Sequence, residues 1–166
     1  MRIIFLDMDG VLNSSKYFDS LGAAEYDGLS FGAGQIDPDA VELLDQLVDA
    51  SDADIVISSS WRLIWNYHEI AEMLKGRGFK NHDRIIGQTN VADDDHRGNE
   101  VQDWLDTDRE RQVVDEDAQP TIAYVILDDN NTFHSNQQAV FVHTNADVGL
   151  TPRDVALAVK ILEGEL

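Results

Sequence analysis

Two pairs of aspartates in the sequence directly follow apolar segments. Asp7 and Asp9 come after Ile3–Leu6, and Asp128 and Asp129 come after a second apolar segment near residue 127. In an α/β sheet the working site lies at the carboxyl ends of the strands, so the four carboxylates converge if the two strands are neighbours. Carboxylates held close together repel one another, and a hard divalent cation such as Mg²⁺ relieves that repulsion. The spacing therefore predicts a magnesium site.

A helix cap, a turn and a calcium-binding loop fit these acids less well. A cap or a turn accounts for Asp9-Gly10 alone, but not for aspartate pairs after two separate strands. A calcium-binding loop needs acids at its positions 1, 3 and 5 and a glycine at position 6. Counted from Asp7, position 5 is Val11 and the glycine falls at position 4. The histidines show no paired ligand spacing, which argues against zinc.

The segments that carry these residues alternate between predicted strands and helices. Apolar runs predict strands at 2–6, 54–58, 84–87, 121–127 and 139–143. Helices are predicted from the Asp37-Pro38 cap onward, at 65–75, at 98–105 and after the Thr151-Pro152 cap. The charged stretch 106–120 is predicted to be a surface loop or an extended helix end, and 14–36 an irregular insertion. The alternation predicts an α/β fold with a doubly wound, mostly parallel, Rossmann-like sheet.

The segment that begins at Asp7 resembles the first motif of the haloacid dehalogenase-like (HAD) phosphohydrolase superfamily, DxDG after a buried strand. Three further motifs follow in the family's order: the serine run 58–60 ends a strand, Arg97 opens a helix, and an aspartate pair ends a later strand. The segments SSSWR, RGNEVQDWL, ILDD and GLT are similar to the small HAD domain of "Swiss army knife" RNA-repair proteins and of stand-alone bacterial proteins. The resemblance implies a single HAD-like hydrolase domain over 1–166 with a minimal cap.

The resemblance also implies roles for the four aspartates. Asp7 would be the nucleophile that forms an aspartyl-phosphate, and Asp9 would protonate the leaving oxygen and later activate water. Mg²⁺ would be held by the Asp7 carboxylate, the Asp9 carbonyl and Asp128. Asp129 would be a further ligand or would act through water.

The phosphate-binding side is assigned by the same resemblance. Ser59 would hydrogen-bond the transferring phosphoryl group, with Ser58 as its close rival, and Arg97 would neutralise the phosphoryl charge. Arg62 has two open interpretations, contact with the substrate phosphate or an ion pair with an acid. The three tryptophans at 61, 65 and 104 are expected to pack in the core or its rim. The remaining candidates for substrate binding are Gly10, Ser58, Ser60 and Arg62.

These assignments predict a Mg²⁺-dependent phosphatase, and two alternatives stay open. One is a phosphatase of a small phosphorylated metabolite, and the other is a non-catalytic phosphoacceptor or Mg²⁺-binding module that resembles a receiver domain. The Asp7-x-Asp9 spacing and the lack of a lysine directly after 139–143 count against a receiver domain. Neither 14–36 nor 61–97 has room for a full cap domain, so we expect an open site that accepts a large substrate such as a phosphorylated polymer end or a phosphoprotein.

The composition bounds the partners. The sequence has 32 acidic against 12 basic residues, a formal net charge of −20, and this charge opposes binding of a nucleic-acid strand. A phosphorylated nucleotide or nucleic-acid end therefore remains a candidate substrate that the charge disfavours. The acidic surface, with acid runs at 93–95 and 115–117, fits either a halophilic host or an ordinary acidic protein.

The length and the cysteine count limit the class of protein. A chain of 166 residues suits one domain, and the lack of cysteine excludes disulfides and a thiol nucleophile. The apolar runs are far too short to cross a bilayer, and the N-terminal segment lacks the pattern of a signal peptide. We therefore expect a cytoplasmic protein without a membrane partner, and no residue pattern indicates an oligomeric state.

Overall fold

A computed structural model describes residues 1–22, 25, 30–92, 96–112 and 122–165, with the backbone alone at 108–112. The strands are β1 (Arg2–Leu6), β2 (Asp54–Ile57), β3 (Ile85–Gln88), β4 (Ala123–Asp128) and β5 (Phe141–His143). The α-helices are α1 (Ser15–Ser20), α3 (Pro38–Ser51), α4 (Tyr67–Gly76), α5 (Arg97–Gln112) and α6 (Pro152–Glu163). Short 3-10 turns are η1 (Ala33–Gln35), η2 (Ser60–Leu63), η3 (His82–Arg84) and η4 (Gln138–Val140).

The five strands form one parallel sheet in the order β3-β2-β1-β4-β5. This confirms the predicted doubly wound α/β fold. Strand β1 has β2 on one side and β4 on the other, so the chain reverses its direction of winding at β1. In such sheets the crevice at the reversal point is the usual ligand site. Leu6 is level with Leu127 in the ladder, so the next residues of both strands, Asp7 and Asp128, end side by side.

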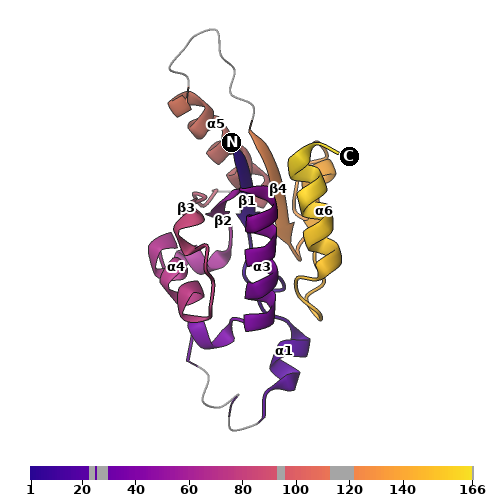
Figure 1. Ribbon diagram of the computed structural model, residues 1–166. Helices are drawn as coiled ribbons and strands as arrows, with labels where there is room; N and C mark the ends of the chain where they lie inside the picture. The colour runs from indigo at the N-terminus through magenta and orange to yellow at the C-terminus, as the bar shows by residue number, and fades with distance from the viewer. Residues whose placement is uncertain (23–24, 26–29, 93–95, 113–121, 166) are drawn as a thin grey trace.

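Helices cover both faces of the sheet (Figure 1). Ile4 and Leu6 of β1 belong to the larger core, which also contains buried side chains of α3, α4 and α6. Ile3 and Phe5 point to the opposite face and pack in a smaller core with α5. All four side chains are fully buried, and each contributes roughly 1.5–3 kcal/mol relative to an exposed position. Burial of both faces explains why this strand is a continuous apolar run.

Two helix starts agree with the predicted caps. Asp37 caps α3 by accepting a hydrogen bond from the Asp39 amide at 2.9 Å, with Pro38 in the first turn. Thr151 caps α6 and forms a capping box with Asp154. Both helices pack against the same face of the sheet, and α6 lies beside α3 (Figure 1).

Some element boundaries differ from the prediction. The segment 14–36 was expected to be irregular, but it contains α1, because the Ser14 hydroxyl accepts a hydrogen bond from the Tyr17 amide and caps the helix. The helix predicted at 65–75 begins at Tyr67, because the Asn66 side chain caps it with two hydrogen bonds. Trp65, where the helix was predicted to begin, lies in a bend between η2 and α4.

The segment after Leu105 had two predicted forms. Helix α5 continues to Gln112, so the extended-helix alternative is confirmed as far as that residue. Most of the remaining stretch, 113–120, lies outside the described residues, as do the first residue of the strand predicted at 121–127 and both acid runs, 93–95 and 115–117. Among the helices that the structure describes, none has the length and apolar character needed to cross a membrane.

Candidate active site

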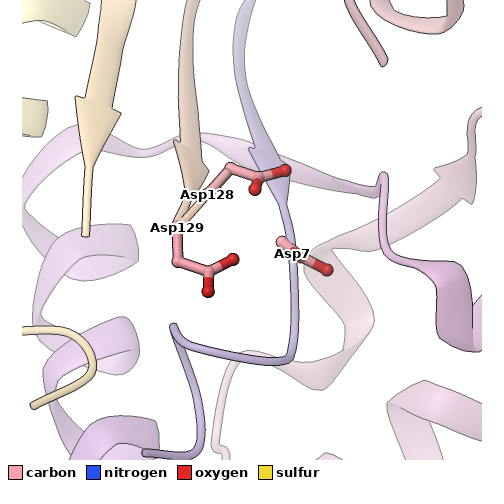
Figure 2. A group of neighbouring side chains, drawn as sticks. All are labelled: Asp7, Asp128 and Asp129. Atoms are coloured by element: carbon pink, nitrogen blue, oxygen red, sulfur yellow. The ribbon is translucent and has the colours of Figure 1, made fainter. Parts of the chain in front are cut away.

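Three carboxylates meet at the carboxyl ends of β1 and β4. Asp7 follows β1, Asp128 ends β4, and Asp129 comes next in the chain (Figure 2). One oxygen of each lies within 4.8 Å of one oxygen of the other two. Asp7 and Asp128 are buried, whereas Asp129 is partly exposed. We call these three residues the carboxylate cluster; a set of close oxygen donors with one open side suits a hard divalent cation.

The turn after β1 brings Gly10 against the cluster. Gly10 has a φ of 71°, in the left-handed region that favours glycine. A Cβ at this position would lie only 2.4 Å from the Cγ atom of Asp129. The Gly10 carbonyl accepts a hydrogen bond from the Thr144 hydroxyl at 2.9 Å, which ties the turn to the chain after β5. Gly10 is thus needed here because any side chain would displace Asp129.

Arg97, the first residue of α5, places its guanidinium between two of the carboxylates. Its Nη1 atom lies 3.1 Å from Asp7 Oδ2 and 2.7 Å from Asp128 Oδ2. It also donates a hydrogen bond to the Ser58 carbonyl at 3.2 Å. The cation therefore offsets part of the negative charge of the cluster and joins the ends of three strands.

Burial opposes charge on the two inner acids. Burial raises the pKa of Asp7, although the Arg97 charge and a hydrogen bond from Ser59 both act to lower it. Burial, followed by the charge of Asp7, raises the pKa of Asp128 to about 7, against the lowering effect of Arg97. At neutral pH the ionisation of all three carboxylates is thus unfavourable, and a bound divalent cation would favour the ionised form.

The serine turn after β2 faces the same site. Ser58 and Ser59 are fully buried, and Ser60 is exposed. The Ser59 hydroxyl accepts a hydrogen bond from the Trp61 amide at 3.3 Å and makes a hydrogen bond with Asp7. The Ser58 hydroxyl is buried without a hydrogen-bond partner among the described residues. Of the two rival hydroxyls, that of Ser59 is the one that contacts Asp7.

A buried ion pair contacts the backbone of the serine turn. Arg62 and Glu100 lie 2.5 Å apart, with only 5% and 2% of their side chains exposed. Arg62 also donates to the carbonyls of Ser58 at 2.8 Å and Ser59 at 2.6 Å. Of the two interpretations of Arg62, contact with the substrate phosphate or an ion pair with an acid, these contacts agree with the ion pair. Sequence reasoning missed Glu100, although it lies one helical turn after Arg97 on α5.

Asp9 is not one of the residues that form the carboxylate cluster. Its side chain is exposed, and its carboxylate accepts hydrogen bonds from Asn13 Nδ2 at 2.8 Å and from Trp61 Nε1 at 3.0 Å. These two donors hold the Asp9 carboxylate in place. Sequence reasoning missed both, although Asn13 ends the first motif and Trp61 directly follows the serine run.

Asp9 also borders a hollow of about 220 Å³. Besides Asp9, its lining residues are Phe31, Gln35, Ser60, Trp61, Ile64 and Trp65. We call this the aromatic hollow. A larger hollow of about 700 Å³ is lined by Trp65, Ala33 and residues at the start of α4. Neither Asp9 nor the carboxylate cluster lines that larger space. A third hollow, of about 390 Å³, is lined by Asp129 and by residues at the end of β5 and after it. Of these three spaces, the aromatic hollow is the one that Asp9 borders.

Residues 3–155 match the family model described as the HAD domain in Swiss Army Knife RNA repair proteins. The chain belongs to this family. No curated protein and no solved structure matches the chain. Membership of the HAD family agrees with the parallel sheet and with the carboxylate cluster at its reversal point.

Proposed function

We propose that the protein is a Mg²⁺-dependent phosphomonoesterase that acts through an aspartyl-phosphate on Asp7. The observation that carries the proposal is the position of Asp7 itself. Its carboxylate lies with Asp128 and Asp129 at the reversal point of a HAD sheet, within 3.1 Å of the Arg97 guanidinium. Phosphoryl transfer mainly requires positioning and neutralisation of charge, and these groups supply both.

The first step is transfer of the phosphoryl group to the protein. An Asp7 carboxylate oxygen attacks phosphorus, the bond to the ester oxygen breaks, and Asp9 donates a proton to the departing oxygen. In the second step Asp9 takes a proton from water, the water oxygen attacks phosphorus, and the bond to Asp7 breaks. The products are an alcohol and inorganic phosphate, and both carboxyl groups return to their starting state.

The remaining residues hold the phosphoryl group and the cation. Arg97 and the Ser59 hydroxyl neutralise and orient the phosphoryl oxygens. The carboxylate cluster, with the Asp9 carbonyl, would hold Mg²⁺. When bound, Mg²⁺ supplies a positive charge that stabilises the phosphoryl oxygens. Three close carboxylates, of which two are buried, support this choice because they suit a hard, oxygen-preferring cation.

Phosphate release tests the proposal directly. The purified protein is incubated with and without Mg²⁺ against a panel of nucleotides, sugar phosphates, aryl phosphates, phosphopeptides and end-phosphorylated oligonucleotides. We expect Mg²⁺-dependent release from at least one class. Release from sugar phosphates alone would favour the small-metabolite alternative. A stable phosphoprotein with no release would favour the phosphoacceptor module, but an acid held by two donors at the position of Asp9 favours hydrolysis.

The family description names RNA repair proteins, which makes a phosphorylated nucleic-acid end one candidate substrate. The net charge of −20 disfavours a long strand, because such a polyanion needs several cationic contacts. The two arginines nearest to the site are already paired, Arg62 with Glu100 and Arg97 with the cluster. We therefore propose that the enzyme acts on a single terminal phosphate.

A further inference from the structure

We propose that the aromatic hollow binds a planar aromatic ring on the leaving group of the phosphate ester. This inference rests on the proposed function, and it specifies the substrate class of the same site. Under that function Asp9 protonates the departing oxygen, so the atoms beyond this oxygen lie on the Asp9 side of the phosphorus. The space that Asp9 borders on that side is the aromatic hollow.

The rings in the hollow offer faces for stacking. The Phe31 and Trp65 rings lie 5.1 Å apart at 45°, and the Trp61 and Trp65 rings lie 5.3 Å apart at 52°. Phe31 is 70% exposed and Ile64 is 61% exposed, an unusual amount of apolar surface next to a polar site. Contiguous exposed apolar surface of this kind marks ligand-binding grooves. A further ring would complete a cluster that is open on the solvent side.

The hollow lacks the charge that a second phosphate or a carboxylate would need. Within the described part of the chain, its lining contains no lysine and no arginine. Its charged group is Asp9, which would repel an anionic leaving group. The polar groups available to the edge of a ring are the Gln35 side chain and the Ser60 hydroxyl. An uncharged ring thus fits better than a charged chain.

The size of the hollow sets a limit on the ligand. At about 220 Å³ it is smaller than the roughly 300–1,000 Å³ of most small-molecule sites, so it has room for a ring system but not for a whole nucleotide. The phosphate would occupy the carboxylate side and the ring the aromatic side. Two sources carry such a ring, a nucleoside and a phenol, and the test separates them.

A matched pair of esters isolates the effect of the ring. 2-Phenylethyl phosphate and 2-cyclohexylethyl phosphate have the same leaving oxygen and similar size but differ in aromaticity. We expect kcat/KM for the phenyl ester to exceed that for the cyclohexyl ester by about threefold to tenfold. This is the factor that corresponds to the additional stabilisation of an aromatic pair beyond its buried area. A nucleoside 5′-monophosphate and phosphotyrosine are then compared at equal concentration to decide between the two sources.

Two variants assign the effect to the hollow. Phe31→Leu removes an exposed ring and keeps an apolar side chain, so we expect the folded protein to lose the phenyl preference, with kcat/KM falling more for the phenyl ester than for the cyclohexyl ester. Leu63→Ala is the control, because Leu63 is also exposed at 66% but does not line the hollow. Binding of 2-phenylethylphosphonate, measured by quenching of tryptophan fluorescence, should weaken by a similar factor in Phe31→Leu only.

The outcomes separate the two proposals. Equal rates on the phenyl and cyclohexyl esters, or an unchanged preference in Phe31→Leu, would overturn the aromatic site while leaving the phosphatase intact. No Mg²⁺-dependent release from any ester would overturn the phosphatase, and the leaving-group site with it. Loss of the preference in Leu63→Ala as well as in Phe31→Leu would assign the effect to the fold of the turn and would also overturn the inference.

Discussion

The two sides of Asp9 are built from different parts of the chain. On one side, the carboxylate cluster comes from the ends of β1 and β4, paired in register in the middle of the sheet. On the other side, the aromatic hollow comes from η2 and from the segment between β1 and α3. The first side is charged and largely buried, whereas the second is apolar and largely exposed.

Under the proposed function, this difference reflects the different tasks of the two sides. A phosphoryl group is the same in every ester, so its site can be held rigidly by strand ends and a buried ion pair. The leaving group varies between substrates, and loops and turns are the parts of a fold that vary without disturbing the core. Trp61 belongs to both sides, because its indole N–H holds Asp9 and its ring faces Trp65.

Replacement of the nucleophile tests the carboxylate side most severely. We expect Asp7→Asn to lower phosphate release by about a thousandfold or more, because an amide does not form the acyl-phosphate. The variant should fold, since the substitution removes a buried charge whose pKa is already raised by burial. Activity is measured with Mg²⁺, and the melting temperature is the control. Wild-type turnover by a folded Asp7→Asn protein would refute the role of Asp7.

Replacement of a metal ligand should have the next largest effect. We expect Asp128→Asn to raise the Mg²⁺ concentration needed for half-maximal activity by about 100-fold, because one of three close carboxylates is lost. Calorimetric titration with Mg²⁺ measures binding without turnover. Asp45→Asn is a matched control, because Asp45 is also a buried aspartate but caps the backbone of Lys80 and Asn81 far along the chain. An unchanged Mg²⁺ requirement in Asp128→Asn would remove this residue from the metal site.

The same aspartate should shape the pH dependence of stability in the metal-free protein. The folded-state pKa of Asp128 is raised from 3.8 to about 7, so the folded protein favours its protonated form. The resulting stabilisation is complete below about pH 4 and is lost as the pH rises through about 7. We expect the free energy of unfolding in EDTA to fall by a few kcal/mol at most over this window. Asp128→Asn should flatten the decline, and an equally steep decline in that variant would contradict the assignment.

The carboxylate side was largely predictable from the sequence. Strands that are buried on both faces appear in the sequence as continuous apolar runs, and Asp7 and Asp128 follow such runs directly. Ligand positions at strand ends then follow from sheet topology. The short helix α1 was missed, because a single serine cap determines six residues in a segment rich in small side chains.

The hydrogen bonds around Asp9 could not be predicted in the same way. Trp61 Nε1 reaches Asp9 across 52 positions of sequence, and this contact depends on where η2 places the indole. The tryptophans were expected in the core or its rim, and Trp61 is indeed buried. The hydrogen bond that it donates to Asp9, however, depends on the position of a single ring nitrogen. The Arg62–Glu100 pair likewise depends on how η2 and α5 approach each other, which no local pattern encodes.

Trp61 offers a way to separate the two sides of Asp9. Trp61→Phe keeps a ring in the hollow but removes the N–H that binds Asp9 Oδ2. We expect kcat to fall about tenfold, because a general acid that is free to rotate is less effective, with a smaller change in KM. The pH profile of kcat should shift as well. Trp104→Phe is the control, since Trp104 packs on Phe5 at the opposite face of the sheet, and an equal loss there would indicate a general effect on the fold.

The smallest expected effect concerns the length of a nucleic-acid substrate. If the carboxylate side binds one phosphate and the hollow binds one uncharged ring, nucleotides beyond the first add few contacts. We therefore expect the rate per phosphate end to be similar for a mononucleotide, a short oligonucleotide and a long strand at fixed salt. Each phosphate contact to a single strand adds a slope of about −0.7 in the dependence of log K on log salt. A slope of about −1 or shallower for all three substrates fits a single terminal phosphate, whereas a rate that climbs steeply with length would require a cationic groove that the net charge of −20 opposes.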